Sequence, residues 1–252
     1  MIGVQTCALP ISATTGANGT GALTGGAGGN VNMIASGAIG VNSTVKVSNS
    51  DATHASRSGG SIKLDSRKTS GTAITIANSG QLLSLLNTTA TGTGGKIVFT
   101  SSGGDILVNG GIVQADRGTV DIRNNGAGSV TLNNAAIRGD VVKVGALGAN
   151  GQLVIGGGAI NADTTLNLYG GTSNGQVHFT GDVALGGRGV KNIAGKTVTI
   201  DDGRTVTIGG TSAARVFTDK ANYTGSGGNA TTTGTFAGQG ATTQGFSKRP
   251  TF

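Results

Sequence analysis

Eleven aspartates are the only acidic residues of this 252-residue chain, and no glutamate is present. Asp201 and Asp202 are the only adjacent pair, and neighbouring residues of a strand point to opposite faces, so this pair does not predict an acid–base site. Asp116, Asp140 and Asp163 precede three successive strands by four, two and three residues. They are candidates to share one corner, although the unequal offsets leave their alignment open and turn chemistry explains each one without a site.

A carbohydrate-active enzyme is one function that these carboxylates leave open, because some parallel β-helices are polysaccharide lyases or hydrolases. Such a site needs a pair of carboxylates for acid–base or nucleophilic chemistry, or several carboxylates that hold Ca²⁺ together with a basic partner. This alternative predicts an exposed groove in which at least two aspartates and a lysine or arginine converge. The aspartates whose positions decide it are Asp105, Asp116, Asp121, Asp140, Asp163, Asp182 and Asp201.

Arg138, Gly139 and Asp140 form the tripeptide RGD, which matches an integrin-binding motif. The tripeptide falls where a corner of the fold is expected and is therefore an adhesion candidate. In a chain with 49 glycines, chance and turn chemistry also account for it. His54 and His178 are far apart and lack ligand spacing, so no metal site is predicted, and no motif indicates a cofactor.

Charge and composition argue against nucleic-acid binding and against a membrane span. The net charge is +7, but the basic residues are mostly single and aromatic residues make up only 3% of the chain, so platforms for base stacking are few. No run of 18 apolar residues occurs, so no transmembrane segment is predicted. Cys7 is the single cysteine, so no intrachain disulfide can form.

Residues 1–12, MIGVQTCALPIS, differ from the rest of the chain. They contain Cys7 and one of the two prolines, and they show none of the periodicity that follows. They also lack the basic and apolar regions of a signal peptide. The string VQTCALPIS looks like translated sequencing-adaptor sequence. We therefore predict that this segment is not native and that the chain is a fragment.

A short strand–turn unit repeats along most of the chain. One or two turn residues are followed by an apolar–polar–apolar stretch and then by small polar residues, as in 94–101 (GGKIVFTS), 117–124 (RGTVDIRN) and 138–145 (RGDVVKVG). Period-2 alternation bounded by Gly, Asn and Asp is typical of short strands. The absence of Glu and the scarcity of aromatic residues favour a narrow aliphatic β core over helices.

Three such strands recur in every stretch of about 23 residues, which is the spacing of a repeat architecture. The first strands of successive groups lie 23, 22 and 24 residues apart. We therefore predict an all-β fold, a parallel β-helix with three short strands per coil, in which equivalent strands stack about 4.8 Å apart. The predicted triplets begin at Ile97, Ile106 and Ile112, at Val120, Val130 and Ile137, at Val142, Leu153 and Ile160, and at Leu166, Val177 and Val183.

The regularity of the repeat varies along the chain. Residues 94–210 form the regular β-helix, whereas 13–93 form looser coils with an insertion near 49–59. The run QLLSLLN at 81–87 fits either a short helix or a heavier strand.

Two further segments depart from the pattern. The stretch 181–196 lengthens one coil and is expected to form a protruding loop. Residues 211–252 are rich in Gly and Thr and fit a terminal cap, an extended tail or a linker.

Strands of the form GG-x-[IV]-x-[VLF], joined by NGG and ADRG turns, resemble the filamentous-haemagglutinin-like exoproteins of two-partner secretion systems. The most similar stretches are 94–126 and 135–170, and the resemblance covers about 28–210. It implies a right-handed β-helical shaft of a large secreted adhesin that is exported through an outer-membrane transporter. The N-terminal secretion domain of this family is not visible, so the resemblance implies a fragment of the shaft or C-terminal region.

These observations predict a non-catalytic structural or adhesive segment of an extracellular or cell-surface bacterial protein. Its expected partners are host or sibling cell surfaces, glycans or matrix, and a rigid spacer is the related possibility. The carbohydrate-active β-helix is the alternative. An ice-binding or crystal-binding solenoid is a third, and it would need a flat threonine array that the scattered TVT strings at 197–199 and 205–207 do not supply.

Overall fold

The structure is a computed structural model that describes residues 29–48, 59–86, 94–224 and 234–252. The segment 1–12 and nearly all of the insertion near 49–59 lie outside these residues. The described residues form parallel strands in three stacks, which we call faces 1, 2 and 3. The prediction of a parallel β-helix with three strands per coil is confirmed.

Face 1 begins each coil. Its strands are β1 (Asn30–Ala35), β4 (Ser61–Ser66), β7 (Lys96–Ser101), the second halves of β9 (Ile112–Asn124), β11 (Ala135–Ala146) and β13 (Gly158–Gly170), and then β16 (Val190–Gly195), β19 (Ala214–Phe217) and β22 (Ala241–Gln244).

Face 2 follows after a turn. Its strands are β2 (Ile39–Val41), β5 (Thr72–Ile76), β8 (Asp105–Asn109), β10 (Val130–Asn133), β12 (Gln152–Ile155), β14 (Gln176–Phe179), β17 (Thr197–Ile200) and β20 (Lys220–Asn222).

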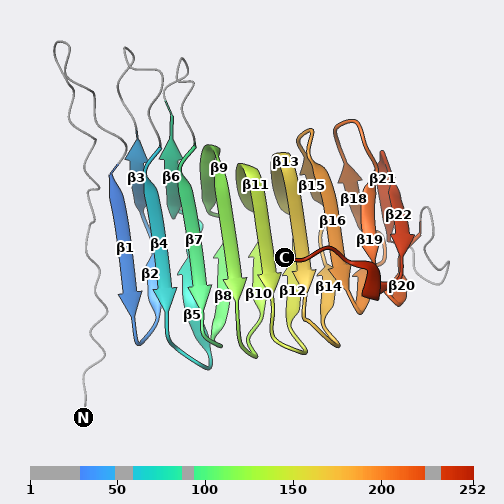
Figure 1. Cartoon of the computed structure of the whole chain (residues 1–252), viewed down its shortest axis with the longest axis horizontal. Helices are drawn as coiled ribbons and strands as arrows, with labels where there is room; N and C mark the ends of the chain where they lie inside the picture. Colours follow the sequence, from blue (N-terminus) through green and yellow to red (C-terminus); the bar gives the residue numbers. More distant parts are fainter. Residues whose placement is uncertain (1–28, 49–58, 87–93, 225–233) are drawn as a thin grey trace.

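Face 3 completes the coil. Its strands are β3 (Thr44–Ser48), β6 (Gln81–Leu85), the first halves of β9, β11 and β13, and then β15 (Val183–Gly186), β18 (Thr205–Ile208) and β21 (Thr235–Gly238). In Figure 1 the face 1 strands run downward in front and the face 2 strands run upward behind them, while the coil advances from left to right. The β-helix is therefore right-handed.

The interior is filled by aliphatic columns that run through successive coils. Ile97 pairs in register with Val120, Val120 with Val142 and Val142 with Leu166, and all four side chains are fully buried. One coil cannot bury its inward row alone, so each coil depends on its neighbours for its core. At the far end of the column the position after Leu166 is occupied by Lys191.

The residues predicted to begin the face 3 strands are not all equivalent in register, although β9 and β15 do begin at Ile112 and Val183. Val113, not Ile112, pairs with Ile137, Ile137 pairs with Ile160, and Leu185, not Val183, continues that column. An apolar doublet gives no alternation, so the pattern does not indicate which of its residues points inward.

The protruding loop predicted at 181–196 is also absent, because this stretch contains β15 and β16, which both pair with β13. Gly187 makes the corner between them with a φ of +80°, a left-handed conformation that glycine adopts without strain. The run at 81–87, which fitted a helix or a strand, forms β6 over Gln81–Leu85.

The stacks continue beyond residue 210 through β19, β20, β21 and β22. Aromatic side chains enter the core at this end. The ring of Phe236 packs edge to face on Phe179 of β14 and on Tyr223, with ring centroids 6.1 Å and 4.8 Å apart. The hydroxyl of Tyr223 hydrogen bonds to Oγ1 of Thr243 at 2.8 Å. These rings fill core space that aliphatic side chains fill in most other coils, apart from Phe99 in β7.

Candidate functional site

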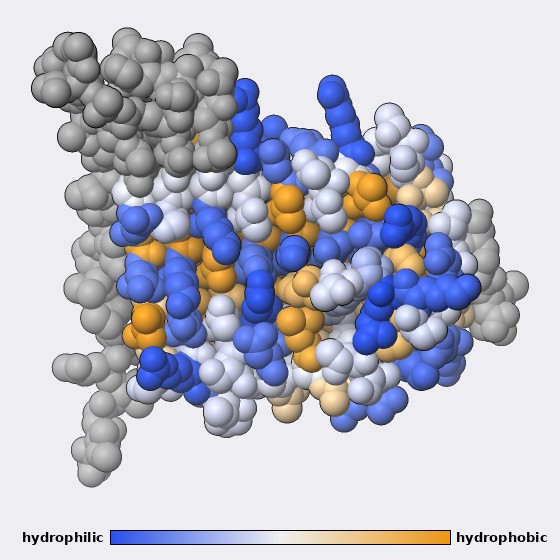
Figure 2. All heavy atoms as spheres, in the orientation of Figure 1, coloured by the Kyte–Doolittle hydropathy of each residue, from blue (hydrophilic) through white to orange (hydrophobic). Residues whose placement is uncertain are grey.

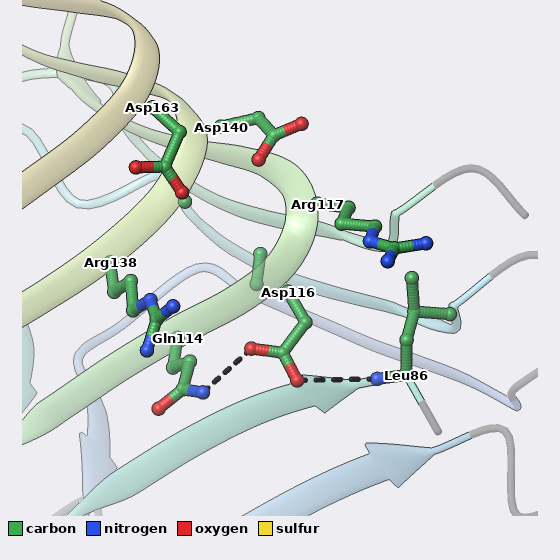
Figure 3. Close-up of a pocket in the computed structure, with 9 residues that line it drawn as sticks. Leu86, Gln114, Asp116, Arg117, Arg138, Asp140 and Asp163 are labelled. Atoms are coloured by element: carbon green, nitrogen blue, oxygen red, sulfur yellow. Dashed lines mark hydrogen bonds between the residues drawn. The ribbon is translucent and has the colours of Figure 1, made fainter. Parts of the chain in front are cut away.

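A hollow of about 380 Å³ opens at the corner where face 3 turns into face 1, across β9, β11 and β13. Its lining residues come from four successive coils, because Leu86 follows β6 and the others lie in β9, β11 and β13. Figure 3 shows that the labelled side chains surround one space. Acidic and basic side chains both line the hollow. The lining residues are Leu86, Gln114, Ala115, Asp116, Arg117, Arg138, Gly139, Asp140 and Asp163.

The backbone at this corner is irregular, and the irregularity positions the charged side chains. The ladders from β11 to both neighbouring strands shift register between Gly139 and Val141, so Asp140 has no partner in either ladder. Arg117 has a φ of +50°, which is uncommon for a residue with a side chain. These two features bring residues with unequal offsets in sequence to the same corner.

Asp116 is fixed by two hydrogen bonds on the floor of the hollow. The side-chain amide of Gln114 donates to Oδ1 at 2.6 Å, and the backbone N–H of Leu86 donates to Oδ2 at 3.4 Å. The carboxylate is therefore oriented from both sides before any ligand arrives.

Asp140 is the carboxylate with the most perturbed environment in the hollow. Burial raises the pKa of Asp140, nearby Asp163 raises it further, and Arg117 partly opposes these effects. A carboxyl group in such surroundings binds its proton more tightly than an isolated aspartate. Arg138 is exposed at the opposite side of the same hollow.

The arrangement combines three carboxylates with two guanidinium groups and one amide. Carboxylates accept hydrogen bonds from hydroxyl groups, and guanidinium groups donate to hydroxyl or anionic oxygens. A polyhydroxylated ligand with one or more acidic groups matches this set. The raised pKa of the Asp140 carboxyl is also the direction that a general acid needs.

The RGD tripeptide belongs to this corner but does not project from it. Arg138 is exposed, Gly139 is buried and Asp140 is half-buried. All three residues lie within β11, where Arg138 is in register with Gln114 and Asn161. The two charged ends of the tripeptide therefore face the hollow together with Asp163.

The other predicted aspartates do not join this site. Asp105 accepts hydrogen bonds from Ser129, Asp121 pairs with Arg123, Asp182 pairs with Arg204, and Asp201 contacts Nε2 of His178 at 2.6 Å. Within the described ranges, no group of three His, Cys, Asp or Glu side chains could hold a metal ion.

The sequence named Arg138, as part of the RGD tripeptide, but it did not indicate Arg117 or Gln114 as site residues. Arg117 and Arg138 each precede a glycine, in the strings ADRG and IRGD. This repeated Arg-Gly pair, which precedes a face 1 strand in both coils, is a signal that could have located the arginines. The contact from Leu86 has no such signal, because it is a backbone N–H of the preceding coil.

Comparisons of the chain with protein-family models, curated proteins and solved structures found no match. In the part of the chain that the structure describes, no helix is long and apolar enough to cross a membrane.

Proposed function

We propose that this chain is a non-catalytic structural or adhesive β-helical segment of a secreted or cell-surface bacterial exoprotein. The observation that carries this proposal is the continuity of the three stacks, from β1 to β22 on face 1, with an aliphatic core along them. A shaft of this kind presents long, regular outer faces at fixed distances, as solenoid proteins do when they bind extended partners.

The surface chemistry supports attachment to glycans, matrix, or host or sibling cells. The net charge of +7 favours anionic partners, because complementary charge speeds encounter. The corner hollow adds a set of hydroxyl- and acid-binding groups from Arg138, Asp140 and their neighbours. The resemblance to filamentous-haemagglutinin-like exoproteins supports a secreted location and export through an outer-membrane transporter.

Binding to immobilised heparin, collagen and cultured cells tests this proposal. We expect saturable binding that leaves the polysaccharide at its original length and that falls severalfold with added salt. If the hollow contributes, Arg138→Ala weakens binding severalfold, while Arg188→Ala, a matched change at another exposed arginine, has a smaller effect. Time-dependent shortening of a polysaccharide would contradict a non-catalytic role.

A carbohydrate-active enzyme is the second candidate, and one observation favours it. Asp116, Asp140 and Asp163 line one hollow with Arg117 and Arg138, which is the convergence that such an enzyme needs. Release of new reducing ends or unsaturated products from acidic polysaccharides would reveal this activity. Under this alternative, Asp140→Asn abolishes turnover, whereas Asp182→Asn, a control on an aspartate outside the hollow, leaves it unchanged.

A further inference from the structure

A segment after the last strand folds back over the outside of the β-helix. Residues Phe246–Phe252, which we call the strap segment, begin with the 3-10 helix η1 (Phe246–Lys248) and run back across face 1 (Figure 1). Phe246 joins Tyr169, Ala194 and Phe217 in an apolar cluster that is separate from the main core. Figure 2 shows hydrophobic patches in the middle of this face, between hydrophilic residues.

Face 1 offers this segment two gaps between large side chains. One outward column contains, in consecutive register, Arg123, Gly145, Tyr169, Ala194 and Phe217. Large and small side chains therefore alternate, and Gly145 and Ala194 leave a gap on each side of Tyr169. The gaps are two strands apart, which is about 10 Å.

The rings of the strap segment occupy these gaps. Phe252 packs edge to face on Tyr169 with centroids 5.1 Å apart, and a Cβ atom added to Gly145 would lie 2.7 Å from the Phe252 ring. Phe246 packs in the cluster with Ala194 and Phe217. The absence of a side chain at Gly145 is therefore what admits Phe252.

Polar contacts fix the direction of the strap segment. The hydroxyl of Tyr169 donates to the carbonyl of Pro250 at 2.6 Å, and Nη2 of Arg249 donates to the carbonyl of Thr172 at 3.0 Å. The carboxylate of Asp219 accepts from the N–H of Phe246 at 3.0 Å.

Cations also approach the second ring of the strap. The side chains of Arg123 and Lys143 lie 5.8 Å and 5.6 Å from the centroid of Phe252, within the range of a cation–π contact. Edge-to-face ring packing, cation–π contacts and directed hydrogen bonds together hold the strap segment on face 1. We call the surface around Gly145, Tyr169 and Ala194 the groove.

The covered part of face 1 also contains one buried polar atom without a partner. In β7 the outward side chains of Val98 and Thr100 are partly exposed, whereas Asn167 and Tyr169 of β13 and Asn192 and Ala194 of β16 are buried. Among these buried side chains, Oδ1 of Asn192 has no hydrogen-bond partner within the described residues. A buried acceptor without a partner is unfavourable, and contact with water would relieve it. The strap segment adds no strand to any stack, so its release leaves the ladders intact.

We propose that this groove is a docking site for an extended segment with two aromatic residues six positions apart, and that the strap segment of one molecule docks in the groove of a second copy of the chain. Within one molecule the linkage gives the strap a high effective concentration, about millimolar for a short connection. Docking between copies is therefore detected only when the intramolecular contact is removed. The arrangement is then a domain swap, in which two protomers exchange an identical element. This inference is independent of the adhesive function and of the corner hollow.

Two complementary variants of the full chain test the proposal. Gly145→Val fills one gap and leaves the strap segment unchanged, whereas Phe246→Ala combined with Phe252→Ala removes both rings and leaves the groove open. We expect each variant alone to be monomeric by sedimentation velocity and the mixture to form a one-to-one complex. A mixture that stays monomeric at about 100 μM of each chain, below the effective concentration within one molecule, overturns docking between copies.

A labelled peptide of residues 245–252 provides a second measurement that does not depend on the folding of the Gly145 variant. We expect it to bind the double-alanine variant at least tenfold more tightly than the unmodified chain, whose groove is occupied. Equal binding to both chains, or no binding to either, overturns the docking groove.

The matched control is Gly40→Val. Gly40 is exposed on β2, and a Cβ atom added there meets nothing within 4 Å. When this variant replaces Gly145→Val in the mixture, we expect no complex with the double-alanine chain, because its own groove still holds the strap segment. A complex with the control as strong as with Gly145→Val would contradict the proposed role of the gap.

Discussion

At the scale of single residues, Lys191 and Asp140 are charged groups whose surroundings disfavour their charge. Lys191 is 1% exposed and continues the inward column of face 1, and its ammonium group donates to the carbonyls of Gly187 and Gly189 at 3.0 Å and 3.1 Å. Burial lowers the pKa of Lys191 below its ordinary value of 10.5. Asp140 shows the opposite shift at the corner hollow, since burial raises its pKa.

Lys191→Met tests the buried lysine through the pH dependence of stability. In the unfolded chain Lys191 has its ordinary pKa of 10.5. At pH values between the lowered folded pKa and 10.5, the unfolded chain therefore binds more protons at Lys191 than the folded chain does. The unmodified chain is therefore expected to gain stability relative to the methionine variant as pH rises through this window. Denaturant unfolding of both chains at several alkaline pH values measures the difference, and two parallel pH profiles would contradict it.

Asp140→Asn tests the hollow in the same way at acidic pH. The folded pKa lies above 3.8, so the folded chain binds more protons and loses stability as pH rises from 3.8 through the folded value. We expect the asparagine variant to be more stable than the unmodified chain at pH 7, with the advantage shrinking towards pH 3. Asp182→Asn, a control at an aspartate of another corner, should show no such gain; thermal unfolding at both pH values compares the three chains.

At the scale of elements, strand alternation and turn residues predicted the repeat but not the details of its corners. The inward columns of faces 1 and 2 follow from period-2 alternation, as in Val120 and Ile122. The doublet Ile112-Val113 carries no alternation, and the glycine-rich stretch around Gly187 has the composition of a loop although it forms a tight corner.

The corner hollow could be predicted only in part, for a similar reason. The approach of Asp140 to Asp163 depends on the register shift after Gly139, which is set by contacts between coils and not by local sequence. The contact of Leu86 with Asp116 is made by backbone and leaves no trace in the residue types. The carboxylates and Arg138 were therefore candidates from sequence, whereas Arg117, the Gln114 amide and the Leu86 N–H were not.

Replacement of one inward side chain tests the stacking of the elements. Ile122 is fully buried between Phe99 and Val144 of the neighbouring coils. We expect Ile122→Ala to lower the free energy of unfolding by about 2–5 kcal/mol because it removes buried methyl groups and leaves a cavity. Thr131→Ala, on the outward side of β10, should change it by no more than about 0.5 kcal/mol. Equal effects of the two substitutions in denaturant titrations would argue against this inward–outward assignment.

At the scale of the whole molecule, the continuous ladders of the right-handed β-helix predict a shaft that is rigid along its axis. Thr75 and Thr199 both lie on the outer side of face 2, and the paired positions Leu107, Thr131, Val154 and His178 connect them strand by strand. Five strand spacings separate the two threonines, which corresponds to about 24 Å. The proposed functions of spacer and attachment surface both need this distance to be fixed.

Pulsed electron-spin resonance between nitroxide labels at positions 75 and 199 measures this distance directly, in a chain whose single Cys7 is replaced by Ser. The β-helix predicts one narrow distribution centred near 24 Å, apart from the length of the labels. The same result is expected with and without a bound polysaccharide, because a rigid shaft does not bend on attachment. A broad distribution, or a centre displaced by many strand spacings, would contradict the stacked fold and the rigid shaft on which the proposed function depends.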